Sequence, residues 1–311
     1  MKRTRNQHGA ENTGAKRQDS YARITDHIVK AIETGAATFQ MPWHRESGST
    51  ARPKNALTDH VYSGVNVVSL WSAAADKGYD SPLWATYKQW NVLGGHVRKH
   101  QKGTPSVFYK SFSKTVHDKD TGNPRDEQFR FARTSWLFNL DQVDDYTPTA
   151  PVARDKSLVE IVEEADDFVS GIGADIRHGG DRAYYSPARD YVQMPDRDRF
   201  TGSSTRSATE SYYAVLFHEL THYSGHKSRL NRTHADERRK ESYAFEELIA
   251  ELGGAYLCAD HNITNEPRPD HAAYVSGWLA VLDRDKRAIF KAARKAQDAV
   301  DYLSSVSAPD F

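Results

Sequence analysis

The stretch Phe217-His218-Glu219-Leu220-Thr221-His222 places two histidines four residues apart, with a glutamate directly after the first. In a helix, His218 and His222 lie one turn apart on the same face and can bind one metal ion. Glu219 would then stand beside the metal and could accept a proton from a water molecule that the metal activates. This HExxH arrangement is typical of zinc metallopeptidases, although two histidines at this spacing also occur by chance on solvated helices.

A second helical stretch, 245–251, offers the third ligand that a catalytic zinc site needs beside its open position. Glu247 and Glu251 are four residues apart and therefore share one helix face. The pattern Glu247-x-x-Ala250-Glu251 resembles the E-x-x-A-[D/N/E] element of glutamate-type zincins, which implies that Glu247 is the ligand and Glu251 orients a histidine N–H. The reverse assignment stays open. His226 lies one turn beyond His222, and three consecutive turns span roughly 12 Å, too far for one ion.

Composition limits the class of protein. The 311 residues suffice for two domains, and 27% of them are charged. No apolar run is long enough to span a bilayer, and the polar, basic residues 1–20 form no secretory signal. The single cysteine, Cys258, excludes an internal disulfide and suits a reducing compartment. We therefore expect a cytoplasmic, monomeric protein without membrane contact.

The charge is unevenly distributed along the chain. Residues 1–150 hold 21 Lys and Arg against 15 Asp and Glu, whereas residues 151–311 hold 21 against 27. We predict a disordered basic arm over 1–20, one domain over 21–145, a Pro/Thr-rich linker over 146–155 and a second domain over 156–311. The basic half is the candidate for an anionic partner.

The periodicity of apolar residues predicts an α+β fold. In the first half we expect a helix over 21–34, a turn within 62–71 that leads into a helix ending near Gly78, and a helix over 84–93. A basic hairpin at 97–105 and two strands at 106–112 and 130–140 should follow. In the second half we expect a β-hairpin within 182–194 and helices over 158–169, 209–224, 243–259, 271–282 and 286–303. One small sheet followed by helices fits the zincin plan.

Several motifs in combination resemble the ArdC-type antirestriction proteins of conjugative plasmids, to which the N-terminal regions of some conjugation primases are related. The matching stretches cover roughly residues 20–265 and are Pro42-Trp43, Tyr62-x-Gly64-x-Asn66, 84–89, 93–99, 102–109, 138–142, 218–230 and 246–253. The family form has tryptophan where Tyr223 stands and threonine at Ser224, and neither change alters the metal chemistry.

The resemblance implies an N-terminal domain that binds single-stranded DNA, a C-terminal zincin-like metallopeptidase domain, and protection of incoming plasmid DNA from host restriction. Basic grooves with aromatic platforms are how proteins hold single strands. Residues 84–110 interleave both residue types, although any one aromatic there is more often a core residue. The candidate DNA contacts are Arg98, Lys99 and Lys102, with Lys88, Lys110, Trp43, Tyr62 and Asn66 as further choices.

Three hypotheses remain open at this point. The chain is a DNA-bound peptidase that cleaves proteins such as restriction enzymes, a DNA-coating protein whose metal is structural, or a protease for DNA–protein crosslinks. The general base Glu219 favours a hydrolytic site, because a structural site does not require one. The expected ion is Zn²⁺, and Mn²⁺ or another divalent ion also suits a His/His/Glu site.

Overall fold

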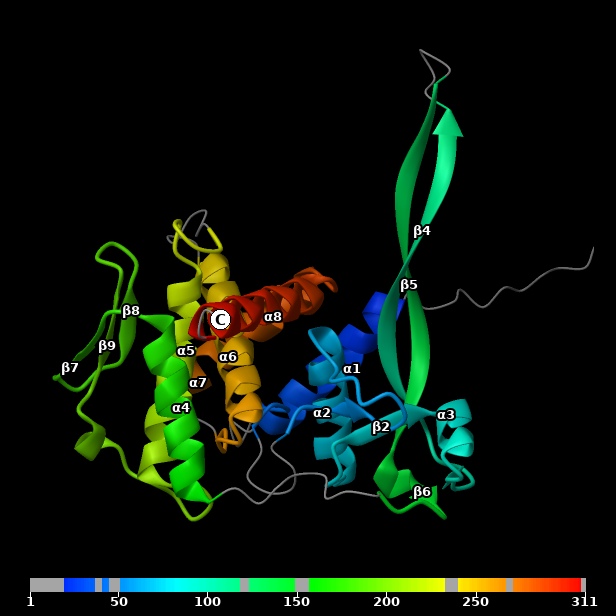
Figure 1. The fold of residues 1–311 in the computed structure, drawn as a ribbon, viewed down its shortest axis with the longest axis horizontal. Coiled ribbons are helices and arrows are strands. Elements are labelled where there is room, and N and C mark those ends of the chain that lie inside the picture. The colour runs from blue at the N-terminus through cyan, green and yellow to red at the C-terminus, as the bar shows by residue number, and fades with distance from the viewer. Residues whose placement is uncertain are drawn as a thin grey trace, which may run out of the picture.

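The protein has the mixed α+β fold that its sequence predicts (Figure 1). The structure, a computed structural model, describes residues 20–36, 41–44, 51–117, 123–148, 157–232, 240–266 and 271–308, and the predicted basic arm 1–20 lies almost entirely outside them. Its helices are α1 Ser20–Ala36, α2 Val65–Lys77, α3 Tyr87–Val92, α4 Leu158–Ile172, α5 Ala208–Ser224, α6 Lys240–Asp260, α7 His271–Arg284 and α8 Ala288–Ser307, with short 3-10 turns η1 Leu140–Gln142 and η2 Arg197–Arg199. Its strands are β1 Lys54–Asn55, β2 Leu83–Thr86, β3 His96–Val97, β4 Thr104–His117, β5 Pro124–Asn139, β6 Val143–Asp144, β7 Ile176–His178, β8 Tyr184–Ser186 and β9 Tyr191–Met194.

The N-terminal half is built around a long antiparallel hairpin of β4 and β5 that extends well beyond the helices (Figure 1). At its base the hairpin joins a four-stranded sheet of order β1-β2-β5-β4. Helix α2 covers the outer edge of β4 there, because the Asn66 amide exchanges hydrogen bonds of 2.8 and 2.9 Å with the backbone of Val107. Ser69 adds a bond of 2.9 Å to the Pro105 carbonyl. These side chains replace a neighbouring strand at the sheet edge.

Two predictions for this half are wrong. The segment 84–93 is not one helix, because Trp84–Thr86 belong to β2, which pairs with β5. The helix α3 begins only after Thr86, whose side chain forms a capping box with Gln89. The segment 97–105 is not a hairpin either, since Val97 pairs with Val143 of β6. In both places the decisive partner strand lies about 50 residues further along the chain.

The C-terminal half consists of packed helices with a small sheet on one flank (Figure 1). Helix α5 packs against α6, and α6 against α7 and α8. The flanking sheet has the order β7-β9-β8, with β8 and β9 antiparallel as predicted and β7 added in parallel to β9. Helix α5 begins with a capping box between Ser207 and Glu210, which starts the helix three turns before its histidines.

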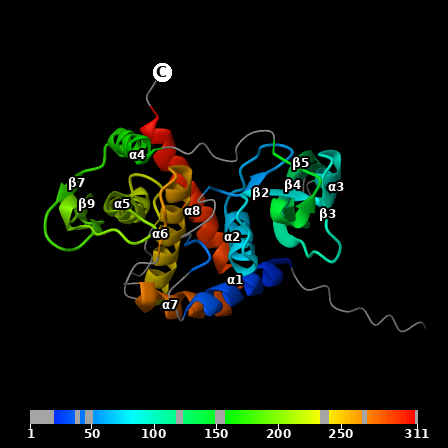
Figure 2. The same ribbon diagram turned by 90° about the horizontal axis from the view of Figure 1, so that it is seen from below.

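The two halves share one continuous hydrophobic core. Seen from below, α1 and α2 lie between the β4–β5 hairpin and the C-terminal helices (Figure 2). The rings of Trp71 and Tyr256 are 5.9 Å apart, and the Tyr256 hydroxyl donates to the Gly64 carbonyl at 3.0 Å. The buried Arg52 donates to Asp260 and Gln297, both at 2.7 Å. The predicted linker 146–155 lies mostly outside the described residues, which stop at 148 and resume at 157.

Candidate metal centre and cleft

Helices α5 and α6 cross at very short distance beside the HExxH residues. A Cβ atom added at Gly254 would stand 3.2 Å from the His218 backbone nitrogen, and one at Gly253 would stand 2.5 Å from the Thr221 side chain. Two glycines in the second helix therefore let its backbone approach the first. This contact brings the glutamates of α6 to the histidines of α5.

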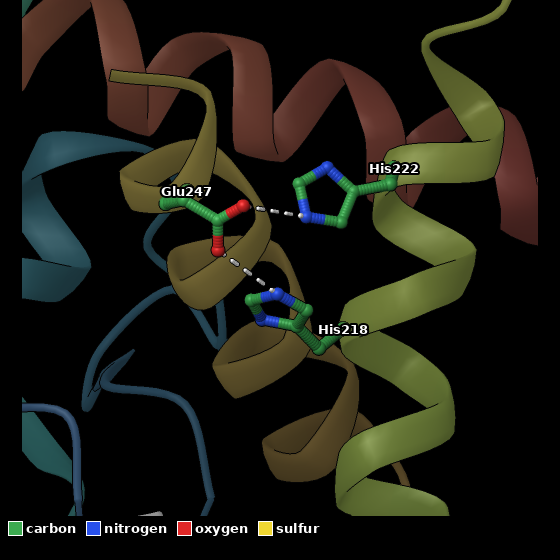
Figure 3. Close-up of side chains that lie close together, drawn as sticks. All are labelled: His218, His222 and Glu247. Carbon is green, nitrogen blue, oxygen red and sulfur yellow. Dashed lines mark ion pairs between the residues drawn. The ribbon is translucent and has the colours of Figure 1, made fainter. Parts of the chain in front are cut away.

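The predicted ligands come together in a buried group (Figure 3). His218 Nε2 lies 3.5 Å from one carboxylate oxygen of Glu247, and His222 Nε2 lies 3.6 Å from the other. One ligand atom from each of the three residues lies within 4.8 Å of the others. These donors can reach a single ion, and two imidazoles with one carboxylate suit a zinc-type site.

Each histidine turns its other nitrogen towards a further carboxylate. His218 Nδ1 lies 3.6 Å from Glu251, and His222 Nδ1 lies 3.5 Å from Glu246. Such carboxylates fix the ring orientation of metal-binding histidines. The geometry therefore brings Glu247 to the ligand position and Glu251 to the orienting position, while the ligand roles themselves stay predictions. Glu246 is an orienting residue that the sequence pattern did not single out.

Arg232 holds Glu246 in place. Its guanidinium donates to the Glu246 carboxylate at 3.0 and 3.3 Å and to the Ser224 hydroxyl at 2.8 Å. Burial alone would raise the pKa of Glu246, but hydrogen bonding to His222 and the charge of Arg232 lower it to about 2. Burial likewise opposes ionisation of Glu247, whose pKa is lowered to about 2 by His218 and His222. Both carboxylates are therefore ionised at neutral pH.

Glu251 is held from the other half of the chain. The Trp43 indole donates to its carboxylate at 3.1 Å, and His44 Nε2 lies 3.0 Å from the same oxygen. Trp43 is only 1% exposed. Its predicted role as a DNA contact is therefore wrong for this structure.

The histidines line a cleft of ≈ 930 Å³ between α5, α6 and the small sheet. Glu219 lines it beside the histidines, as a general base requires. The edge strand β8 contributes Tyr184 and Tyr185 to the lining of the cleft. The Tyr185 hydroxyl donates to Asp190 at 2.8 Å, so this tyrosine already has a partner.

Tyr243 is a cleft residue that the sequence analysis missed. Its hydroxyl lies 3.3 Å from that of Tyr274, which also lines the cleft. Burial, the Tyr274 hydroxyl and the negative charge of Glu247 all raise the pKa of Tyr243. Tyr243 precedes Glu247 by four residues on α6, and this helical spacing could have revealed it.

Comparisons with known proteins identify the family to which this fold belongs. A family model described as zincin-like metallopeptidase matches residues 163–295, and one described as the N-terminal domain of anti-restriction factor ArdC matches residues 18–138. The crystal structure of the ArdC antirestriction protein from plasmid R388 in its metal-free form is 38% identical, with a TM-score of 0.73, covering 93% of this chain and 98% of that one. The chain belongs to the ArdC family.

Other ArdC-related proteins match over almost the whole chain. The Mn(II)-bound structure of the R388 protein has a TM-score of 0.68 and covers 94% of this chain. The uncharacterized protein y4eC of Sinorhizobium fredii is 44% identical over 289 residues, which are 92% of this chain and 91% of the relative. The DNA primase TraC of Escherichia coli is 33% identical over 297 residues, and the match spans only 27% of the primase.

The remaining candidate DNA contacts of this ArdC-family chain divide by exposure. Lys88, Lys99 and Lys102 are exposed near α3 and the base of β4, and their contact with DNA stays a prediction. Arg98 is also exposed, but it binds the Asp144 carboxylate at 3.2 Å and the Asp141 carbonyl, so it joins β3 to η1 and β6. The side chain of Lys110 lies outside the described residues.

Tyr62 and Asn66 have structural partners instead. Tyr62 is 2% exposed and accepts a hydrogen bond of 2.9 Å from Asn55, which excludes base stacking in this structure and corrects the prediction. The side-chain amide of Asn66 forms hydrogen bonds with the Val107 backbone of β4, so it already has partners within the protein. Among the described side chains of α3, β4 and β5, the exposed aromatics are Tyr87, Phe108, Tyr109 and Trp136.

Proposed function

We propose that this chain binds single-stranded DNA entering by conjugation and hydrolyses peptide bonds of proteins bound to that DNA, restriction enzymes included. The observation that carries the proposal is the convergence of His218, His222 and Glu247 in a cleft that Glu219 also lines. A structural metal site requires neither the cleft nor the base. The antirestriction family of the chain supports the link to incoming DNA.

The three donor side chains fit a divalent ion, because two imidazoles and an ionised carboxylate lie within reach of one another. Zn²⁺ is the ion that this donor set favours, and the Mn(II)-bound structure of the R388 relative supports Mn²⁺ as an alternative. When bound, such an ion would lower the pKa of a water molecule and polarise the scissile carbonyl.

The chain's own residues supply the remaining steps of the proposed hydrolysis. Glu219 accepts the proton of the attacking water and delivers it to the leaving amine. The edge strand β8 lies along the cleft with one side unpaired in its sheet, so it can pair with an extended peptide. Hydrogen bonding to β8 would align the substrate backbone with Glu219.

We assign DNA binding to the N-terminal half, with the domain boundary at 146–155 and a monomer as the working unit. Lys88, Lys99 and Lys102 are exposed, and so are the rings of Trp136 and of Tyr87, which directly precedes Lys88. Phosphate contacts by lysine with stacking on aromatic rings are the means by which single strands are held without sequence preference. Among the described residues, no helix has the length and apolar character of a membrane span.

The proposal is tested by mass spectrometry of a DNA-binding protein incubated with the metal-loaded chain, with and without single-stranded DNA. We expect cleavage that requires DNA and that Glu219→Gln reduces by at least about a hundredfold, in line with the usual contribution of a general base. Glu219→Gln should still bind DNA and metal. Neutralising Lys88, Lys99 and Lys102 should weaken DNA binding. The slope of log K for DNA binding against the logarithm of the salt concentration should become shallower by about 0.7 per lost phosphate contact.

The outcomes separate the three hypotheses. Cleavage of the same protein without DNA would contradict the DNA-directed part of the proposal. Absence of cleavage with intact DNA binding would favour a DNA-coating protein. Preferential cleavage of covalently crosslinked proteins would favour the crosslink protease.

A further inference from the structure

The two orienting carboxylates of the centre are held from different parts of the chain. Glu246, which faces His222, is bound by Arg232, a residue of the same half. Glu251, which faces His218, is bound by Trp43 and His44, which precede it by more than 200 residues. The N-terminal half thus reaches the metal centre at one defined point.

At Glu251 the contact between the halves includes directed hydrogen bonds. The backbone N–H of Met41 donates to His44 Nδ1 at 3.0 Å, so in the neutral imidazole the proton resides on Nε2. His44 then donates through Nε2 to the Glu251 oxygen 3.0 Å away, and the Trp43 indole N–H donates to that oxygen at 3.1 Å. The other Glu251 oxygen is left facing His218 Nδ1 at 3.6 Å.

The segment that carries these donors is itself fixed. Trp43 packs against Trp278 of α7 with ring centroids 5.9 Å apart, and its carbonyl accepts from Asn265 at 3.3 Å. The side chains of His44 and Glu251 are 0% and 5% exposed. A buried carboxylate with such donors keeps one orientation, because water cannot replace a lost partner.

We propose that Trp43 and His44 are positioning residues of the metal centre. They hold Glu251 in the orientation that fixes the His218 ring with Nε2 towards Glu247. The metal centre is therefore complete only when the N-terminal half is docked, which gives a physical reason for the two family domains to occur in one chain. This inference rests on the proposed metal site but not on peptide hydrolysis.

The test is the affinity of the full chain for Mn²⁺, measured by electron paramagnetic resonance of the free ion. Trp43→Phe removes the indole N–H and keeps a smaller aromatic ring, and His44→Ala removes the second donor. Loss of a group that orients a metal-binding histidine typically lowers metal affinity by about 10- to 100-fold. We expect about a tenfold loss for each variant, with unchanged circular dichroism of the metal-free protein.

A matched control distinguishes positioning from general damage to the core. Trp90 is also fully buried and donates its indole N–H, at 2.9 Å to the Phe138 carbonyl, but it belongs to the separate small core cluster beside α3. Trp90→Phe should leave Mn²⁺ affinity unchanged. In a Glu251→Ala background, Trp43→Phe should have no further effect on Mn²⁺ affinity, because Glu251 is the group through which Trp43 is proposed to act on His218.

Three results would overturn the inference. The first is wild-type Mn²⁺ affinity in both Trp43→Phe and His44→Ala. The second is an equal loss in Trp90→Phe, and the third is a Trp43→Phe effect that persists in the Glu251→Ala background. If His218→Ala abolishes Mn²⁺ binding while Trp43→Phe and His44→Ala do not change it, the proposed metal site stands and this inference fails. If the wild type binds no Mn²⁺ or Zn²⁺, both fail together.

Discussion

At the scale of single residues, the metal centre depends on buried charges that neutralise one another. Arg232 is 7% exposed and supplies the positive charge that keeps Glu246 ionised beside His222. Leaving one member of a buried ion pair without its partner costs more than the pair contributes, because the remaining charge stays out of water. The geometry of the centre and the stability of the fold are therefore linked at this arginine.

Arg232→Met is accordingly expected to lower the free energy of unfolding by about 3 kcal/mol in urea titrations of the metal-free protein. Arg294→Met is the matched control, since Arg294 is exposed and pairs with Asp298 on the surface at 3.9 Å, and its loss should not change stability measurably. Equal free energies of unfolding for Arg232→Met and wild type would contradict this account, because Glu246 would then not be a buried charge without a partner in the variant.

Residue roles could be predicted where they depend on local spacing. The shared helix face of His218 and His222, with Glu219 beside it, follows from helical periodicity. Glu247 was expected as the ligand from the resemblance to glutamate-type zincins, and the ligand and base roles stay predictions. Trp43 could not be assigned in this way, because its partner Glu251 is 208 residues away and nothing in the adjacent sequence indicates burial. The role of Arg232 could not be predicted either, because Arg232 follows α5 in a stretch without a periodic pattern.

At the scale of elements, the crossing of α5 and α6 sets the distances within the centre. Gly254 allows the helices to approach until its Cα faces the His218 backbone. Helical apolar spacing predicted both helices, and both begin within about three residues of the expected positions. It did not predict β2 or the β3–β6 pair, because two-residue and four-residue strands carry no period of their own and depend on a remote partner.

Gly254→Ala should separate the two helices by a few tenths of an ångström and weaken Mn²⁺ binding in the resonance titration. The gain in helix propensity of up to about 1 kcal/mol should be outweighed by overpacking against backbone, which typically costs 1–3 kcal/mol. Gly171→Ala is the control. Its Cβ on α4 would clash with the Ser307 carbonyl of α8 at 2.4 Å, at a helix contact that does not involve α5 or α6. That variant should lose stability but keep its metal affinity, and equal affinity in both variants would contradict the role of the helix crossing.

At the scale of the whole molecule, the continuous core makes the two halves one folding unit. Helices α1 and α2 pack on α7 and α8, and Arg52 crosses between the halves to Asp260 and Gln297. The charge asymmetry and the Pro/Thr-rich linker predicted two domains with separate tasks, but composition carries no information on the area that joins them. A shared core allows the N-terminal half to set the geometry of the centre.

Differential scanning calorimetry of the metal-free chain should therefore show one cooperative transition, with equal calorimetric and van't Hoff enthalpies. Arg52→Ala should lower the midpoint of that single transition, because it removes two partly buried hydrogen bonds between the halves. Two resolved transitions, of which Arg52→Ala shifts only one, would contradict a common core.

The most direct test of the central claim is conjugative transfer of an unmodified plasmid into a restricting recipient that expresses the chain. The variants to compare are wild type, Glu219→Gln, and the combined neutralisation of Lys88, Lys99 and Lys102, which spares the structural Arg98. We predict that both variants lose protection, although Glu219→Gln still binds DNA and metal. Transfer with Glu219→Gln as efficient as with wild type would contradict a hydrolytic role for the centre.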